Sequence, residues 1–258
     1  MMKKFKQFME IHQQAEPLLI GNVWNVQSAR MFEKNGYQAL ATSSAAIAET
    51  YGYEDGEEIS FEDYLFMIRK IAQSTDLPLS IDLEAGYGDS VQQIVSNIKT
   101  LTDLGIAGIN LEDSMVNKGA RTLLDAKVFA EKLKLICNQL RSEQTEIFIN
   151  IRTDVFLLSI DNPLSEALAR IDLYENTGVH GIFFPCITDL TQITRVVNAT
   201  SLPVNVMCMP GLPDFSSLKQ AGVKRISSGN FLNKHAYSEL DKALDTIHEE
   251  QSFKRLFS

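Results

Sequence analysis

Cysteine, tryptophan and long apolar runs are scarce in this sequence. Its 258 residues include three cysteines and one tryptophan. An odd number of cysteines without metal-type spacing argues against a disulfide framework and fits a reducing cytosol. No segment approaches the roughly 18 apolar residues that span a bilayer. No apolar run of about 7–15 residues follows the amphipathic N-terminus, as a signal peptide would require. The sequence therefore predicts a cytoplasmic protein with no membrane partner.

Positive charge is also in short supply. Lysine and arginine total 24 against 33 aspartates and glutamates, which gives a net charge of −9 at pH 7. An acidic chain repels nucleic acid and anionic membranes, so neither is expected as a partner. The basic pairs Lys3-Lys4 and Lys224-Arg225 are too short to change this. The composition, 45% hydrophobic and 22% charged, is otherwise that of a globular protein with a large core.

What the sequence has in abundance is alternation between short apolar runs and longer helical patterns. No linker interrupts it, so residues 1–258 are expected to form one domain. We expect strands at Leu18–Val23, Ala39–Ser43, Leu79–Leu83, Gly108–Glu112, Ile147–Thr153, Gly181–Pro185, Val204–Met209 and Arg225–Ser228. We expect helices at Val26–Asn35, Ser60–Gln73, Ser90–Leu104, Ala126–Leu140, Leu164–Asn176, Leu190–Val197, Phe215–Gln220 and Asn233–His248. This alternation is typical of an α/β fold, the (β/α)8 TIM barrel. A doubly wound open sheet is the alternative, but no glycine-rich dinucleotide loop follows the first strand.

The third predicted strand ends in acids and glycines, at Asp82-Leu83-Glu84-Ala85-Gly86. Residues two apart in a strand point to the same side, so Asp82 and Glu84 are expected to aim two carboxylates at one point. In a TIM barrel the active site lies at this C-terminal end of the strands. Carboxylate oxygens there suit Mg²⁺ or Mn²⁺, which bind through a few carboxylates, waters and substrate oxygens.

The next two strands end in further charged residues. Glu112 ends the fourth strand, while Asn150 and Arg152 share a face at the end of the fifth. Acids gathered at one rim repel each other unless a cation lies among them, so Asp82, Glu84 and Glu112 predict a divalent metal. Arg152 is then free to bind a substrate carboxylate through two parallel hydrogen bonds.

Small residues follow the second strand, at Thr42-Ser43-Ser44-Ala45-Ala46. Their backbone N–H groups could approach an anion or an oxyanion. A metal, an arginine and backbone amides together fit a 2-oxo acid, because the metal chelates the carboxylate and keto oxygens and stabilises an enolate. We therefore expect Ser43, Ser44, Ala45, Asn150 and Arg152 to bind the substrate.

Structural roles remain open for several of these residues. Arg152 can instead form an ion pair with Asp154 or Glu112. For Asp154, a structural or supporting role is the favoured interpretation. Glu112-Asp113 can cap a following helix. A barrel isomerase that binds phosphate is a further alternative, because Met209-Pro210-Gly211 and Ser227-Ser228-Gly229-Asn230 follow the strands at which such barrels hold phosphate.

Several motifs, in this order and spacing, resemble the isocitrate lyase / phosphoenolpyruvate mutase superfamily. They are Thr42-Ser43-Ser44-Ala45-Ala46, Gly52-Tyr53-Glu54-Asp55, Asp82-Leu83-Glu84-Ala85-Gly86-Tyr87-Gly88, Asn110-Leu111-Glu112-Asp113 and Asn150-Ile151-Arg152-Thr153-Asp154. The resemblance implies a (β/α)8 barrel that binds Mg²⁺ at Asp82, with Glu84 and Glu112 reaching the ion, often through water. It implies that Asp55 lies on a mobile loop near the reacting group and that Trp24 lines the pocket. It also implies a homodimer or homotetramer that exchanges the last helix between subunits.

Departures from the superfamily's patterns bear on the substrate. The loop after the fourth strand reads Met115-Val116-Asn117-Lys118-Gly119-Ala120-Arg121-Thr122, without the Lys-Lys/Arg-Cys-Gly-His motif of isocitrate and methylisocitrate lyases. Phe184-Pro185-Cys186 stands where the phosphonopyruvate mutases and hydrolases usually have a histidine after strand six. Glu84 replaces the second acid of the usual Asp-x-Asp pair, a variant that occurs in a less characterised, phosphonomutase-like branch.

These observations predict a Mg²⁺-dependent carbon–carbon lyase that acts on a small 2-oxo or 2-hydroxy carboxylate through a metal-bound enolate. Decarboxylation of an oxaloacetate-like acid fits best, because it needs little acid/base machinery. Lys118, Arg121 or Asp55 is expected to supply the closing contact or the proton. Phosphonomutase or phosphonopyruvate hydrolase activity is the enzymatic alternative, and a barrel that binds a carboxylate without catalysis is another.

Overall fold

The computed structural model describes residues 2–117 and 119–257, and in this part of the chain eight parallel strands close into a barrel. The barrel strands are β1 (Leu18–Val23), β2 (Leu40–Thr42), β3 (Leu79–Asp82), β4 (Gly108–Glu112), β7 (Phe148–Arg152), β8 (Gly181–Phe184), β9 (Val204–Met207) and β10 (Arg225–Ser227). They are hydrogen-bonded in the order β1-β10-β9-β8-β7-β4-β3-β2, and β2 pairs with β1 to complete the circle. Each was expected from the sequence, so the predicted (β/α)8 barrel is confirmed.

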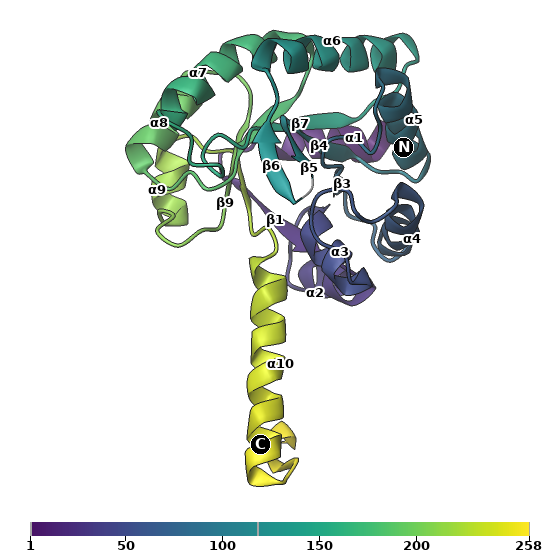
Figure 1. Cartoon of the computed structure of the whole chain (residues 1–258), viewed down its shortest axis with the longest axis vertical. Coiled ribbons are helices and arrows are strands. Elements are labelled where there is room, and N and C mark those ends of the chain that lie inside the picture. Colours follow the sequence, from purple (N-terminus) through teal and green to yellow (C-terminus); the bar gives the residue numbers. More distant parts are fainter. Residues whose placement is uncertain (1, 118, 258) are drawn as a thin grey trace.

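Helices cover the outside of the barrel (Figure 1). They are α2 (Val26–Lys34), α3 (Ser44–Tyr51), α4 (Phe61–Ala72), α5 (Val91–Asp103), α6 (Ala126–Ser142), α7 (Pro163–Tyr174), α8 (Leu190–Asn198) and α9 (Phe215–Gln220). Short 3₁₀ helices follow at η1 (Glu175–Thr177) and η2 (Lys254–Phe257). Among the described residues, no helix is both long and apolar enough to cross a membrane.

The two faces of the strands explain where the core lies. Outward-facing Ile81, Ile109 and Ile151 are fully or almost fully buried in the apolar layer between the strands and the helices. Helix α1 (Met2–Ile11) lies under the N-terminal end of the barrel, where Phe8 packs against Phe148 from β7. At the opposite end, β3, β4 and β7 finish in charged residues, Asp82, Glu112 and Arg152.

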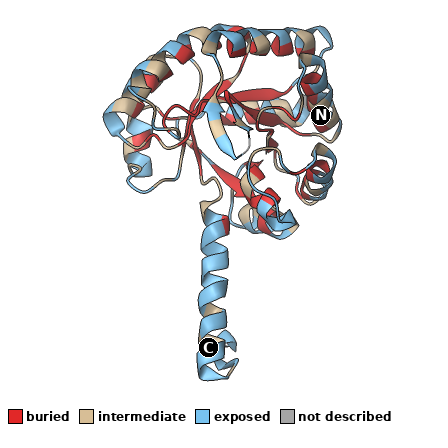
Figure 2. Ribbon diagram, viewed as in Figure 1, coloured by how far each residue is buried: buried red, intermediate tan, exposed pale blue. Residues whose placement is uncertain are grey.

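Three elements depart from the expected pattern. Helix α3 begins directly after β2, with Ser43 as its N-cap, so the residues expected as a strand-end loop form the first turn of a helix. The segment after β4 forms an antiparallel hairpin, β5 (Ser114–Asn117) and β6 (Ala120–Leu123). The last helix, α10 (Phe231–Glu250), is longer than expected and projects away from the barrel with its surface almost entirely exposed (Figures 1 and 2).

Candidate active site

A cavity of about 170 Å³ opens at the C-terminal ends of the strands. Residues from every strand of the barrel contribute to its wall. Those expected from the sequence are Ser43, Ser44, Ala45, Asp55, Asp82 and Arg152. The cavity therefore gathers half of the predicted site on one surface, while Glu84, Glu112 and Arg121 are not among the residues that line it.

Asp82 ends β3 and is held in place from several sides. Its Oδ2 accepts a hydrogen bond of 2.9 Å from the Ser44 hydroxyl, and Asn110 donates to Oδ1 at 3.4 Å. Its backbone N–H donates to Thr42 Oγ1 at 2.9 Å, and its carbonyl accepts from the Tyr64 hydroxyl at 2.9 Å. Burial raises the pKa of the Asp82 carboxyl, whereas the nearby arginine of β7 lowers it. The structure thus fixes this carboxylate at the cavity wall.

Glu84 reaches the acid cluster in a different way from the one expected. Strand β3 ends at Asp82, so strand alternation does not place the two carboxylates on one face. Instead, Glu84 adopts a left-handed backbone with φ of 50°, which is uncommon outside glycine. Its side chain is 2% exposed, and Tyr87 donates to its Oε1 at 3.1 Å while Oε2 has no partner. Burial first, and then the carboxylates of Asp55 and Glu112, raise its pKa well above the usual value.

Glu112 is compensated by arginines within the protein itself. Its Oε2 lies 3.0 Å from Nη1 of Arg152, and its Oε1 forms an ion pair with Arg121. Burial nevertheless raises its pKa to about 7, although Arg152 lowers it. Two arginines therefore already supply positive charge beside Glu112, and its contact with a metal stays a prediction.

Arg152 is not free in the structure. Besides Glu112, it is bound by Asp154, whose Oδ1 accepts from Nε at 2.6 Å and whose Oδ2 accepts from Nη2 at 3.1 Å. Burial alone would lower the pKa of Arg152, but these two carboxylates hold it well above the usual value. The ion-pair alternative for Arg152 and the supporting role of Asp154 are thus both present, while Arg152 also lines the cavity.

The hairpin β5–β6 places Arg121 at the mouth of the site. Arg121 Nη2 lies 2.9 Å from Oδ2 of Asp55, and Nη1 lies 3.3 Å from Oδ2 of Asp154. Asp55 follows α3 and also lies 3.5 Å from the Ser44 hydroxyl. Two of the three residues predicted to close the site, Arg121 and Asp55, are therefore in direct contact. Lys118, the third, lies outside the described residues.

Two predicted substrate-binding residues lie elsewhere. Trp24 lines an outer groove between α2 and α10, together with Met31 and Ala236. Trp24 lies between the buried Val23 at the end of β1 and Asn25, the N-cap of α2. At this point the chain has left the barrel, so the Trp24 side chain lies outside it. Asn150 is buried inside the barrel, where its amide donates to Asn110 Oδ1 at 3.0 Å, and it does not line the cavity.

The cavity-wall residues that sequence reasoning missed include two polar ones, Asn22 and Arg225. Asn22 Oδ1 accepts hydrogen bonds from the backbone N–H groups of Ser228 and Gly229, at 2.7 and 3.1 Å. Arg225 is the first residue of β10, and its alternation with Ser227 on that strand was the signal that could have identified it as inward-facing.

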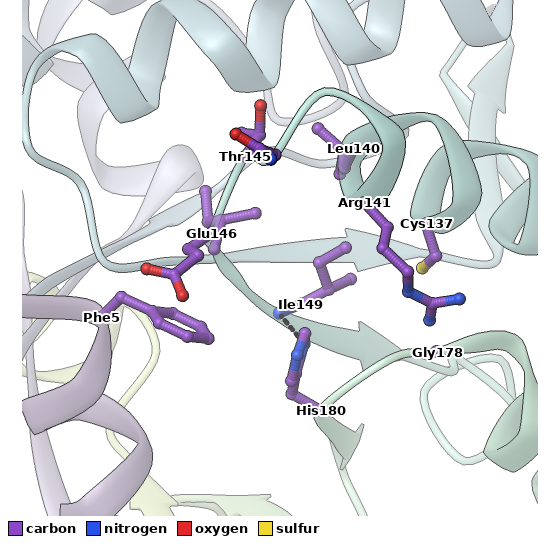
Figure 3. Close-up of a pocket in the computed structure, with 11 residues that line it drawn as sticks. Phe5, Cys137, Leu140, Arg141, Thr145, Glu146, Ile149, Gly178 and His180 are labelled. Carbon is purple, nitrogen blue, oxygen red and sulfur yellow. Dashed lines mark hydrogen bonds between the residues drawn. The ribbon is translucent and has the colours of Figure 1, made fainter. Parts of the chain in front are cut away.

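A second cavity, of about 250 Å³, lies at the N-terminal end of the barrel (Figure 3). It is formed by Phe5 of α1, by Arg141 of α6 and by residues that precede β7 and β8, including Glu146 and His180. His180 accepts a hydrogen bond from the backbone N–H of Ile149 at 3.1 Å. Glu146 is the one carboxylate among its described lining residues, so this cavity is separate from the acid cluster.

The geometry of the acid cluster limits how it could hold a metal ion. Within residues 2–117 and 119–257, no three His, Cys, Asp or Glu side chains converge closely enough to hold a metal by themselves. Asp82, Glu84 and Glu112 therefore do not form a cage of three direct ligands. Mg²⁺ usually keeps several waters and takes only one or two carboxylates. Asp82, with the unpartnered Glu84 Oε2 nearby, fits such a hydrated ion.

Fold and site together define a (β/α)8-barrel protein with an acid-rich pocket at the C-terminal ends of its strands. The chain belongs to the phosphoenolpyruvate phosphomutase family, whose sequence profile matches residues 8–248. This confirms the superfamily that the motifs resemble.

Individual relatives cover most of the chain. A solved structure from Burkholderia cenocepacia J2315, provisionally classed as a phosphonomutase, is 33% identical with a TM-score of 0.87, and the match covers 94% of this chain and 99% of that one. The 2-methylisocitrate lyase of Escherichia coli is 25% identical over 73% of this chain and 64% of its own length. The oxaloacetate decarboxylase of a Bradyrhizobium species is 27% identical over 76% of this chain and 67% of its own length. The last two relatives are carbon–carbon lyases.

Proposed function

We propose that the protein is a divalent-cation-dependent lyase that breaks a carbon–carbon bond in a small 2-oxo or 2-hydroxy acid, with decarboxylation of an oxaloacetate-like acid as its reaction. The observation that carries this proposal is the placement of Asp82, Ser44 and Arg152 in the wall of one small cavity. Relatives named for methylisocitrate cleavage and oxaloacetate decarboxylation support the reaction class.

The metal assignment rests on the carboxylate groups gathered around Asp82, among which Glu84 Oε2 has no hydrogen-bond partner. Mg²⁺ or Mn²⁺ would be held by Asp82, with Glu84 and Glu112 reaching it through water. When bound, the ion would supply a Lewis acid that polarises substrate oxygens. The carboxylate partners of Arg152 hold its guanidinium in a fixed orientation at the cavity wall, which favours binding of a planar carboxylate.

The hairpin β5–β6 favours a simple reaction. Its described residues include no cysteine or histidine. The hairpin instead carries Arg121, which forms ion pairs with Glu112 and Asp55. An arginine stays protonated at neutral pH, so it can orient charge but does not act as a general base. Loss of carbon dioxide needs only delocalisation of the electron pair left on C3 and its later protonation, which agrees with this residue set.

Turnover of a substrate panel tests the proposal. Purified protein with Mg²⁺ is incubated with oxaloacetate, other 2-oxo diacids and 2-methylisocitrate, and the products are measured by ¹H NMR. We expect consumption of an oxaloacetate-like acid that chelation of the metal abolishes. If the protein binds oxalate, an enolate mimic, yet leaves the whole panel unchanged, the lyase proposal is wrong and a barrel that binds carboxylates without catalysis takes its place.

Phosphonomutase or phosphonopyruvate hydrolase activity is the second candidate, favoured by the family match and by the Burkholderia structure. A ³¹P NMR assay on phosphonopyruvate distinguishes it from the lyase. A phosphate-binding isomerase is disfavoured, because the backbone N–H groups of Ser228 and Gly229 already donate to Asn22 and are not available to phosphate.

We further propose that the protein assembles as a homodimer or homotetramer through α10. This helix has 20 residues, and Asn233 is its one buried residue. Leu240 and Leu244 lie one turn apart and are 51% and 55% exposed. An isolated helix is marginal in water without an apolar face packed against something. A second copy of the chain supplies such a surface in the groove that contains Trp24 and Met31.

A further inference from the structure

Arg225 lies inside the barrel. It begins β10, where it pairs with Leu18 of β1 and Asn205 of β9, and it is 1% exposed. Its side chain lines the same cavity as Asp82 and Arg152. In the circular strand order β10 lies across the barrel from β4, so Arg225 approaches the cavity from the side opposite Glu112.

The guanidinium of Arg225 has no counter-charge of its own. Its Nε and Nη1 are buried without a hydrogen-bond partner, and the described acids of the site pair with Arg121 and Arg152 instead. Two other arginines differ: the part-buried Arg152 is paired with two acids, and the buried Arg170 with Asp113 and Glu166. Burial lowers the pKa of Arg225 to about 10. The charge of Asp82 has a smaller effect and raises it.

Its neighbours inside the barrel do not supply the missing partner. Asn205 donates to the Ser227 hydroxyl at 3.2 Å and accepts from Asn150 at 3.4 Å, so these polar groups are satisfied among themselves. His12, from the end of α1, is buried and neutral, because burial and then Arg225 lower its pKa to about 3. Arg225 therefore remains a cation, still protonated at neutral pH, with unused donors.

A buried charge without a partner is costly, and its cost is offset when an anion enters beside it. We propose that Arg225 binds a second carboxylate of the substrate, so that the preferred substrate is a dicarboxylate whose far end points toward β10. This inference rests on the proposed function, because it takes the first carboxylate to lie near Arg152 and the amides of Ser44 and Ala45. It makes Arg225 a specificity-determining residue.

Binding of two matched 2-hydroxy acids tests the assignment. Malate and lactate share the hydroxy-acid end, and malate alone has a second carboxylate. Calorimetry with Mg²⁺ present is carried out on the unmodified chain, Arg225→Met, Arg225→Lys and, as a control for loss of one positive charge, the exposed Arg69→Met. We expect Arg225→Met to weaken malate binding roughly 10- to 100-fold, the range of a hydrogen bond to a charged group. Lactate binding should stay within about twofold, Arg225→Lys should fall between, and Arg69→Met should change neither.

Thermal unfolding without ligand separates binding from a structural role. An unpaired buried arginine replaced by methionine should leave the melting temperature equal or higher. If Arg225→Met and Arg225→Lys both fail to fold, or if both acids lose affinity equally, Arg225 is structural and the inference is wrong. If the unmodified protein binds both acids equally well, the inference is wrong but the proposed function stands. If it binds neither acid and consumes no 2-oxo acid, both are wrong.

Discussion

Arg121 and Asp55 are 66 positions apart in the sequence, yet their side chains form an ion pair of 2.9 Å at the mouth of the cavity. The pair joins the hairpin β5–β6 to the loop after α3. The Arg121 side chain is 13% exposed and the Asp55 side chain 40%, so the two ends of the pair lie in different surroundings. Substitution of Arg121 should therefore have different consequences from substitution of Asp55.

Arg121→Met should be the more damaging substitution. It leaves Glu112 and Asp154 with one cation fewer, and burial already raises the pKa of Glu112. We expect a loss of about 1–3 kcal/mol in the free energy of unfolding and a fall in kcat/KM. Asp55→Asn removes a half-exposed acid and should cost at most about 1 kcal/mol. Urea denaturation of both variants measures this, and equal losses would contradict the asymmetry.

Asp82→Asn should abolish the response to metal. The amide keeps the size of the side chain and its bonds to Ser44, but it lacks the charge that a divalent ion requires. We expect activity to fall roughly 100-fold or more and Mg²⁺ binding by calorimetry to disappear. The matched control is Asp89→Asn, an exposed acid on the loop after the same strand. Equal loss of metal binding in both variants would move the metal site away from Asp82.

The strand positions and the composition of the rim could be predicted from the sequence, because alternation and strand ends are local patterns. Both ion-pair partners of Arg152 were among the alternatives that the sequence offers, but only the packing of β4 against β7 shows that Arg152 contacts Glu112 and Asp154 at the same time. Glu84 joins the cluster through a turn with positive φ, which strand periodicity does not describe. Trp24 lines the groove between α2 and α10, and the turn that places it there cannot be read from strand periodicity.

A buried ion pair that does not line the cavity should control stability. Arg170 Nη1 lies 2.7 Å from Asp113, which is fully buried and also accepts from the Tyr174 hydroxyl at 3.0 Å. Arg170→Met leaves the Asp113 charge without its cation and should cost about 3–5 kcal/mol. Glu166→Gln removes the exposed partner of the same arginine and should cost at most about 1 kcal/mol. Chemical denaturation compares the two variants, and similar costs would show that burial of Asp113 does not matter.

His12 should make the protein less stable in mild acid. Its Nδ1 lies 2.6 Å from the Phe8 carbonyl oxygen and therefore carries the proton, while burial, and then Arg225, lower the ring's pKa from 6.5 to about 3. Below pH 6.5, His12 binds a proton in the unfolded chain but stays unprotonated in the folded chain. The free energy of unfolding should therefore fall as the pH drops from 6.5 toward 3, by up to about 1.4 kcal/mol per pH unit.

Two variants isolate this contribution of His12. Between pH 6.5 and 5, His12→Gln should lose about 2 kcal/mol less stability than the unmodified chain. The exposed His248→Gln should follow the unmodified chain. Urea denaturation at both pH values gives the slopes. Parallel slopes for His12→Gln and the unmodified chain would mean that His12 is not the group responsible.

The exposed face of α10 should determine the oligomeric state. Leu244→Asp places a charge on the apolar face of a helix whose other described side chains are almost all exposed, so an assembly that buries this face has to bury a carboxylate without a partner. We expect light scattering after gel filtration to give a dimer or tetramer for the unmodified chain and a monomer for Leu244→Asp. Lys242→Asp puts the same acid on the opposite side of the helix, where Lys242 pairs only with Glu239, and should leave the mass unchanged. A monomeric unmodified chain, or dissociation by both variants alike, would rule out assembly through this face.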